Sequence, residues 1–588
     1  MPKIAVIAWV TAAAFCLLFL MGATAVRAGQ TVVEIKDLKI GDLVVQGFEL
    51  SQKGDVEISM VAAGVKYSKG LFAYGWIIRV ADRELVWTMQ EDCEDPSRLS
   101  KTLVECDETI TLPAGKYEVY YYTGSPRNFL FGDVNLSVND LGDLVDLLGD
   151  VFHFDEEDSI RFFDEDVEEL EMSISTDISA RAYMPTFSKP AGAVVYINQP
   201  ERDELQQQGF TLKTEADLQI YAIGEFSDSY DLFVDGGWII SADTREKVWV
   251  MDKWNTEWAG GADKNRYVRD VIALPAGNYV ACYATDDSHD PGDWNSPPPA
   301  DPMNYGMMIT AAKATDAANI SIYNDTLNEV EIVKLVRIRD DSFKKAGFTL
   351  KKDARIRILA LGERNYSGNE LADYGWITDV DNSEKIWEMT GENTDFAGGA
   401  AKNCRFDGII DLPAGNYMVY YRTDDSHAYG DWNAAAPFDK SNWGISLFGV
   451  GKEFTAGSFA RVEDFPPSGK MLADLTALGD NADVSRKFTL SQSTSIKVTA
   501  LGEGRSGEMF DYGWIEDAKT GETVWEMTYR KTRHAGGADK NRLAVANITL
   551  DKGTYEVFFV TDDSHSFEDF NASPPDDPER WGILITEK

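Results

Sequence analysis

The chain has few cysteines, too few for a disulfide framework to replace a hydrophobic core. Of its 588 residues only 5 are Cys, whereas small secreted disulfide scaffolds are dense in them. Cys93 and Cys106 flank one loop and are predicted to pair if the compartment is oxidising. Cys282 lies in an apolar, strand-like segment and is expected to be a buried thiol.

Basic residues are also under-represented. Asp and Glu total 98 against 56 Lys and Arg, a formal net charge of −42. A field of that sign repels a phosphate backbone or an anionic lipid surface, so nucleic acid is excluded as the expected partner. Cationic ligands, divalent metal ions and neutral polymers such as glycans remain compatible with it.

Long apolar runs are missing except at the start of the chain. Lys3, an apolar run over residues 4–21 and the small-residue ending Val26-Arg27-Ala28 together predict an export signal over residues 1–28. A retained membrane anchor is the weaker alternative, because the run is barely long enough to span a bilayer. The mature chain is therefore expected to be secreted or periplasmic and to have no membrane span.

Amphipathic runs of helical length are absent as well, and a repeated strand-like unit is present instead. The motif GWI, a polar turn and then VW or IW places pairs of tryptophans eleven residues apart at Trp76/Trp87, Trp238/Trp249, Trp376/Trp387 and Trp514/Trp525. Around each pair, apolar and polar residues alternate with a period of two, which is typical of strands with one buried face. Recurrence at long, regular spacing indicates a tandem array of one module.

The predicted fold class is all-β, with four tandem β-sandwich (jelly-roll-like) modules after the signal peptide. The expected boundaries are 1–28 for the signal, 29–145 for a first module with a degenerate loop, 146–190 for an acidic insertion and linker, and 191–312, 313–450 and 451–588 for the remaining modules. The linkers contain apolar pieces, so they are expected either to add an edge strand or to form the contact between neighbouring modules.

The pairing of FTL at Phe348 with LPAGNYMVYY at residues 412–421 resembles bacterial pre-peptidase C-terminal domains, which are β-sandwich appendages of exported hydrolases. The resemblance applies to single modules and implies an accessory, non-catalytic role without any active-site residue. The GWI/VW hairpin departs from that family's pattern.

A polar loop, TDDSH followed by an acidic–aromatic–Asn triplet, recurs in the last three modules and is the candidate metal site. Clustered carboxylates at the end of a strand suit Ca²⁺, whereas a His among them suits a transition metal. A structural loop is nevertheless the favoured interpretation over a metal site, because Asp and Ser more commonly bond to backbone amides. The candidate ligands are Asp286, Asp287, His289 and Asp293; Asp424, Asp425, His427 and Asp431; and Asp562, Asp563, His565 and Asp569.

A second repeated element, GGADKNR or GGAAKNCR, places lysine and asparagine near glycines that permit positive φ. These residues are expected to form ion pairs that tether the TDDSH loops. The alternative is a joint pocket for a sugar or a carboxylate. The candidate ligand-binding residues are Lys264, Asn265, Lys402, Asn403, Lys540, Asn541, Trp294 and Trp432.

Catalysis is not expected, because Ser288 and His289 are sequence neighbours and no nucleophile-elbow pattern occurs. The leading hypothesis is a non-catalytic repeat protein that binds a glycan or a protein at the cell envelope, with loops stabilised by Ca²⁺ and several similar sites acting together. The alternatives are a structural envelope spacer without a ligand and a metal-dependent hydrolase.

Overall fold

The computed structural model describes residues 29–64, 71–92, 103–124, 167–324, 329–365, 370–382, 384–466 and 469–588. These residues form two compact units, one of 29–188 with 294–301 and one of 189–293 with 302–588. No helix among them is long and apolar enough to cross a membrane. The predicted signal peptide over residues 1–28 lies outside the described residues.

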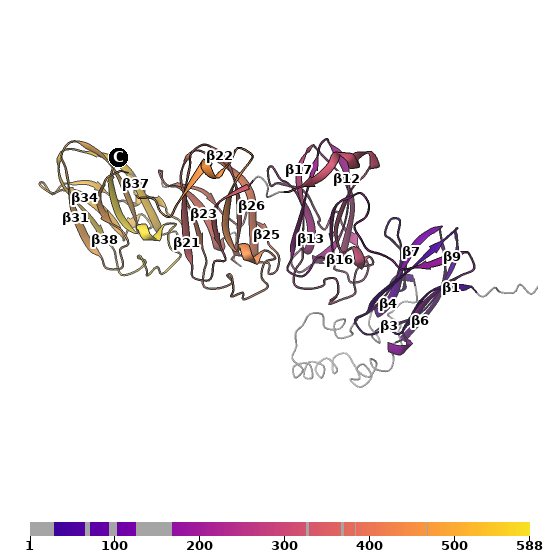
Figure 1. Ribbon diagram of the computed structural model, residues 1–588. Helices are drawn as coiled ribbons and strands as arrows, with labels where there is room; N and C mark the ends of the chain where they lie inside the picture. Colours follow the sequence, from indigo (N-terminus) through magenta and orange to yellow (C-terminus); the bar gives the residue numbers. More distant parts are fainter. Residues whose placement is uncertain are drawn as a thin grey trace, which may run out of the picture. The chain divides into compact units, whose positions relative to one another are not determined.

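The first unit contains the first module, an antiparallel two-layer sandwich (Figure 1). One layer runs in the order β1-β8-β3-β6 and the other in the order β9-β2-β7-β4-β5, and β3 pairs with β4 where the layers join. The elements are Gln30–Ile35 (β1), Leu43–Leu50 (β2), Gly54–Gly64 (β3), Leu71–Arg79 (β4), Glu84–Thr88 (β5), Met89–Asp92 (α1), Leu103–Leu112 (β6), Gly115–Thr123 (β7), Glu171–Thr176 (β8) and Ala180–Tyr183 (β9).

The second module repeats this topology with one added short strand. Its layers are β10-β18-β12-β16-β15 and β19-β11-β17-β13-β14. The strands are Ala193–Asn198 (β10), Leu205–Leu212 (β11), Ala216–Ser227 (β12), Leu232–Ser241 (β13), Lys247–Val250 (β14), Glu257–Trp258 (β15), Asn265–Leu274 (β16), Gly277–Ala284 (β17), Gly306–Ala311 (β18) and Ile320–Tyr323 (β19).

The third module has the same strand order, β20-β28-β22-β26-β25 against β29-β21-β27-β23-β24. Its strands are Glu329–Val336 (β20), Phe343–Leu350 (β21), Ala354–Arg364 (β22), Leu371–Asp379 (β23), Glu384–Glu388 (β24), Asp395–Phe396 (β25), Asn403–Leu412 (β26), Gly415–Arg422 (β27), Gly444–Val450 (β28) and Phe459–Val462 (β29).

The fourth module separates into a sheet β30-β39-β32-β37-β36, which also carries β33, and a sheet β31-β38-β34-β35. Its strands are Met471–Leu475 (β30), Asp483–Leu490 (β31), Thr494–Arg505 (β32), Glu508–Met509 (β33), Tyr512–Asp517 (β34), Thr523–Glu526 (β35), Arg533–His534 (β36), Asn541–Leu550 (β37), Gly553–Val560 (β38) and Gly582–Glu587 (β39).

The cores lie between the paired layers, as the period-two pattern predicts. On β32, Ile496, Val498 and Ala500 are buried, and the side chains between them are only partly covered. Trp525 and Phe559 reach the same core from the opposite sheet. The all-β fold class and the sandwich modules are therefore confirmed.

The structure moves three predicted module boundaries. β8 and β9 pair with β3 and β2, so the first module extends to Tyr183 and the segment 146–190 is not wholly a linker. β19 pairs with β11, and β29 pairs with β21, so the second and third modules end later than residues 312 and 450. These segments are edge strands, one of the two outcomes expected from the apolar pieces of the linkers. Short strands of four residues have too little pattern to be recognised from sequence.

The cysteines behave as small buried groups or as a disulfide partner. Cys282 and Cys404 are free thiols, exposed by 1% and 0%. Cys404 belongs to the core of the third module, whereas Cys282 lies outside the core of the second module, on the outward side of β17 beside Trp238 and Ile240. Cys106 is disulfide-bonded. The predicted partner Cys93 lies outside the described residues.

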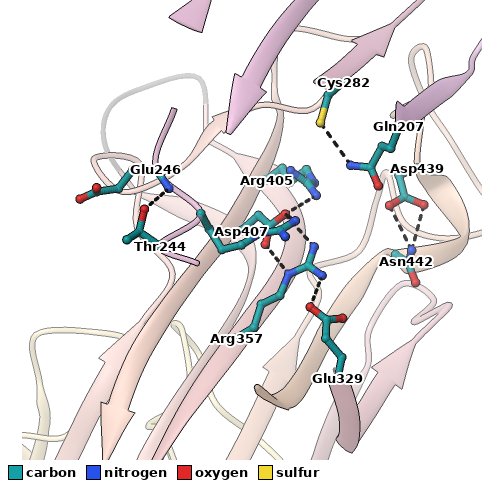
Figure 2. Close-up of polar contacts among 11 residues, drawn as sticks. Gln207, Thr244, Glu246, Cys282, Glu329, Arg357, Arg405, Asp407, Asp439 and Asn442 are labelled. Carbon is teal, nitrogen blue, oxygen red and sulfur yellow. Dashed lines mark hydrogen bonds and ion pairs between the residues drawn. The ribbon is translucent and has the colours of Figure 1, made fainter. Parts of the chain in front are cut away.

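Within the second unit, the second and third modules meet at a buried carboxylate, Asp407 on β26 (Figure 2). Arg357 binds its two oxygens at 2.7 and 2.9 Å, and Arg405 donates to Oδ2 at 2.8 Å. Arg245, which follows β13 of the second module, lies 3.1 Å from the same Oδ2. Burial alone would raise the pKa of Asp407, but the arginine charges outweigh it and hold the pKa well below its usual value.

Candidate functional site

A cluster of three carboxylates recurs in the second, third and fourth modules. In each cluster one ligand atom per residue can be chosen so that all three atoms lie within 4.8 Å of one another. The clusters are Glu225, Asp235 and Asp286; Glu363, Asp373 and Asp424; and Glu503, Asp511 and Asp562. Only the third residue of each set belongs to the predicted TDDSH ligands.

Strand pairing at the corner of the sandwich brings the first two carboxylates together. Glu363 near the end of β22 is the register partner of Asp373 on β23. The third carboxylate, Asp424, comes just after β27, the strand that pairs with β23. The backbone N–H of Asp424 donates to Asp373 Oδ1 at 2.9 Å. The same bond, from the third Asp to the second, measures 2.7 Å in the second module and 2.9 Å in the fourth. The fold therefore builds the cluster three times in one way.

A glycine before each glutamate permits this approach. A Cβ added at Gly224, Gly362 or Gly502 would lie 2.1–2.2 Å from the carbonyl oxygen of the second carboxylate residue. Real Cβ atoms do not approach a carbonyl that closely, so only glycine lets the two strands converge here.

The environment of two of the glutamates indicates a ligand-binding site. Glu363 and Glu503 are exposed by only 5% and 7%. In each, Oε1 pairs with a lysine, Lys402 at 2.8 Å and Lys540 at 3.1 Å. The other oxygen, Oε2, is buried and accepts no hydrogen bond from any described residue. A buried carboxylate oxygen without a donor is costly unless something positive occupies its other side.

The second carboxylates are fully buried, and their pKa values are raised. Burial, with the neighbouring carboxylates adding, raises the pKa of Asp373 to about 8 and that of Asp511 to about 7. Burial also raises the pKa of Asp286 to about 6. Three carboxylates and one lysine leave a formal charge of −2 at each cluster when all are ionised, which a divalent cation balances.

An aromatic donor orients the second carboxylate in each module. Trp443 Nε1 donates to Asp373 Oδ2 at 3.1 Å, and Trp581 Nε1 donates to Asp511 Oδ2 at 2.9 Å. In the second module Tyr305 Oη replaces the indole and donates to Asp235 Oδ2 at 2.6 Å. Each of these donors immediately precedes the glycine that begins β18, β28 or β39.

The three histidines of the TDDSH loops are buried supports of the loop rather than members of the cluster. His427 Nε2 lies 2.6 Å from Asn403 Oδ1, and the Asn403 amide donates to the carbonyls of Gly398 and Ala435. Since those carbonyls fix the amide orientation, Nε2 must donate to the oxygen and carries the proton. Burial and the nearby Lys402 lower the pKa of His427 to about 4.

The same His–Asn bond, at 2.6 Å, joins His289 to Asn265 and His565 to Asn541. Each histidine has a φ between 53° and 57°, a strained region for a residue with a Cβ. The structure thus gives these histidines and asparagines a role in fixing the loop.

The remaining predicted residues surround the cluster. Asp287, Asp425 and Asp563 are exposed. Asp293, Asp431 and Asp569 are exposed as well and close the loop through backbone bridges. Lys264 pairs with Glu225 at 3.0 Å, as the equivalent lysines do, so the lysines bind the cluster glutamates rather than the TDDSH carboxylates. Trp294 is 7% exposed, and Trp432 packs against His427 and Trp443.

The described residues of the first module contain no equivalent cluster. Ala63 and Ala73 form the register pair that Glu363 and Asp373 form in the third module. Gly124 follows Thr123 where Asp286 follows Thr285. The repeated GE pair and the Asp three residues before the first Trp are the sequence signals that locate the cluster, and both are missing from this module.

No protein-family model and no curated protein matches the chain. Among solved structures, the chain is similar to the CUB1-EGF-CUB2 domain of human MASP-1/3 at 10% identity, over 44% of this chain and 98% of that chain, with a TM-score of 0.14. It is also similar to the arabinofuranosyltransferase AftD from Mycobacteria at 10% identity, over 87% of this chain and 38% of that chain, with a TM-score of 0.09. TM-scores this low carry no argument about function.

Proposed function

We propose that this chain is a non-catalytic, exported binding protein whose second, third and fourth modules each hold one Ca²⁺ ion in the Glu–Asp–Asp cluster. The bound ion fixes the TDDSH loop, and the loop is presented to a glycan or a protein at the cell envelope. The observation that carries the proposal is the buried Oε2 of Glu363 and of Glu503, which accepts no hydrogen bond from a described residue and lies beside two further carboxylates.

Calcium fits the donor set better than a transition metal does. The cluster offers only carboxylate oxygens, which Ca²⁺ prefers, and water and loop oxygens supply its remaining ligands. Zinc favours His and Cys, but His427 Nε2 is committed to Asn403. The formal charge of −2 at each cluster matches a divalent ion.

The same hydrogen bond weighs against hydrolytic chemistry. With Nε2 donating to Asn403, only Nδ1 of His427 could accept a proton from a serine, and Nδ1 is buried without a hydrogen bond from any described hydroxyl group. Ser426 donates its backbone N–H to Asp424 Oδ1 at 3.0 Å, as a turn residue does. The export signal predicted over residues 1–28 supports a secreted or periplasmic location.

The test is calcium titration of the intact, EDTA-treated chain by isothermal calorimetry. We expect three ions per chain, one for each cluster. Saturating Ca²⁺ at about 100 times its Kd adds about 2.7 kcal/mol to the free energy of unfolding of each module that binds it, so the thermal midpoint rises. Glu363→Gln removes one site and leaves two.

Asp425→Asn is the matched control, because it removes an exposed carboxylate from the same loop and leaves the stoichiometry unchanged. No uptake of Ca²⁺ and an unchanged melt would contradict the proposal and favour the spacer hypothesis. Uptake of Zn²⁺ in place of Ca²⁺ would contradict the ion assignment.

A further inference from the structure

The outer surface of the sheet β31-β38-β34-β35 in the fourth module carries an aromatic pair that no described segment of the chain covers. Trp514 on β34 and Phe558 on β38 are cross-strand neighbours, stacked with centroids 5.0 Å apart and planes 6° apart. Both are half-buried, and Phe510 beside β34 is 42% exposed. We call the outward side chains of β31, β34 and β38 the β34–β38 face.

The equivalent pairs elsewhere are buried under a loop. In the first unit, Trp76 and Tyr120 are exposed by 1% and 0%, and Trp76 Nε1 donates to Ala300 O at 2.6 Å. In the second unit, Trp376 and Tyr420 are exposed by 0% and 4%. This surface is therefore one that the protein uses repeatedly for docking an extended segment.

The loop that covers the third module is proline-rich and acidic, and the face beneath it is basic. Arg422 donates to the carbonyls of Pro574 and Pro575 at 2.9 and 3.0 Å. Lys385 pairs with Asp576 at 3.1 Å. Lys345 pairs with Glu579. Lys385 and Arg422 also lie 6.0 and 5.6 Å from the Trp376 ring, where they make cation–π contacts.

The fourth module keeps the aromatic pair and reverses the charge around it. Strand register equates Lys345, Lys385 and Arg422 with the uncharged Ser485, Thr523 and Val560. It also equates Phe343, Thr378 and Met418 with the acidic Asp483, Glu516 and Glu556. Relative to the equivalent face of the third module, the β34–β38 face thus has three negative charges and lacks three positive ones. One lysine of the fourth module, Lys487, lies nearby, with Nζ 3.5 Å from the carboxylate of Glu556.

We propose that the β34–β38 face docks a basic, extended segment of another protein, whose lysine or arginine side chain lies over Trp514 between Glu516 and Glu556. The carboxylates select positive charge, and the Trp514 ring supplies the cation–π contact that Lys385 and Arg422 supply within the third module. A second copy of this chain does not fit, because its net charge is −42 and the loops that cover the other faces are acidic. Trp514 Nε1 and Ser485 Oγ donate to Glu516 and Glu556 at 2.8 and 2.9 Å, but these neutral donors leave both negative charges in place, and a neutral glycan would not use that charge.

The test measures binding of a labelled peptide that alternates lysine with proline to the intact chain, by fluorescence anisotropy at low salt in EDTA. We expect saturable binding that weakens as salt rises and about tenfold weaker binding after Glu516→Thr with Glu556→Met. These two replacements are the residues that the third module carries at the same register positions, so the strands accept them. Trp514→Ala is expected to weaken binding as well.

The control is Glu463→Gln with Glu453→Gln, which removes two exposed carboxylates from the third module and is expected to leave the affinity within about twofold. Equal weakening by both double variants would show attraction to the acidic chain as a whole and would overturn the proposal. Two further probes are a peptide that alternates glutamate with proline and the neutral glycan cellohexaose. Tighter binding of the acidic peptide than of the basic one, or binding of cellohexaose without binding of the basic peptide, would overturn the proposal too. EDTA keeps this result independent of the calcium sites.

Discussion

At the residue scale, the spacing of the carboxylate cluster depends on the glycine that precedes each glutamate. Gly362 and its equivalents allow the β22–β23 corner to close until Glu363 and Asp373 face one another. The sequence pointed to the third carboxylate of the cluster, Asp424, because it belongs to a recognisable loop. It did not predict Glu363 or Asp373, because they lie on two strands whose pairing register is not visible in a local pattern.

The role of this glycine in the close approach of the two strands can be tested by Gly502→Ala in the fourth module. The added Cβ would lie 2.2 Å from Asp511 O, so the strands must move apart, and overpacking of this kind costs about 1–3 kcal/mol. We expect a lower melting midpoint and weakened Ca²⁺ binding at one of the three sites, both read by calorimetry. Gly479→Ala is the control, because the Cβ added there would lie no closer than 3.9 Å to another atom, the backbone oxygen of Phe567. Equal effects of the two variants would argue against the close approach as the cause.

At the element scale, the sandwich strands follow from the alternation of the sequence, and the short edge strands do not. β32 has twelve residues and a clear period of two, whereas β29 has four residues and follows a segment that reads as a linker. Contacts with β20, a strand distant in the sequence, help to hold β29 against β21. Arg461 donates to Ile332 O at 2.8 Å and to Glu331 O at 2.9 Å.

Hydrogen exchange tests this edge strand. Because β29 pairs with β21 over residues 459–462, its ladder amides are expected to exchange far more slowly than those of the exposed turn at residues 451–453. Mass spectrometry on peptides that cover the two segments gives the comparison. Exchange at the same rate in both would mean that β29 is a free linker in solution.

At the scale of the whole molecule, the contact between the second and third modules depends on residues far apart in the chain. Arg245 and Asp407 are 162 positions apart. Arg245 lies in the variable polar turn between Trp238 and Trp249, and Asp407 belongs to no repeated motif. The four-module organisation could be predicted from the tryptophan spacing. The junction could not, because it depends on single side chains that differ between modules.

The Asp407 junction predicts a pH dependence of stability. An unfolded Asp has a pKa of about 3.9, and the arginines hold the folded-state pKa well below that value. The stabilisation is therefore complete above about pH 4 and is lost as the pH falls toward the folded pKa. Asp407→Asn is expected to cost about 3–5 kcal/mol at pH 7, because three arginines lose their buried partner.

Denaturant unfolding at pH 7 and at pH 3 measures this effect, and the gap between wild type and Asp407→Asn should narrow at the lower pH. Asp411→Asn, an exposed position on the same strand β26, is the control and should change little. A gap that is the same at both pH values would contradict the assigned electrostatic role.

The two free thiols, Cys282 and Cys404, can report on local opening of the structure. Cys282 and Cys404 are buried in the second and third modules, and the fourth module has no cysteine. A thiol reagent therefore modifies Cys404 only when the third module opens, whereas Cys282, on the outward side of β17 near Arg245, Arg405 and Asp407, becomes accessible when the junction between the second and third modules opens. The relative rates of modification, read from labelled peptides, compare opening of the junction with unfolding of the third module without any engineered probe.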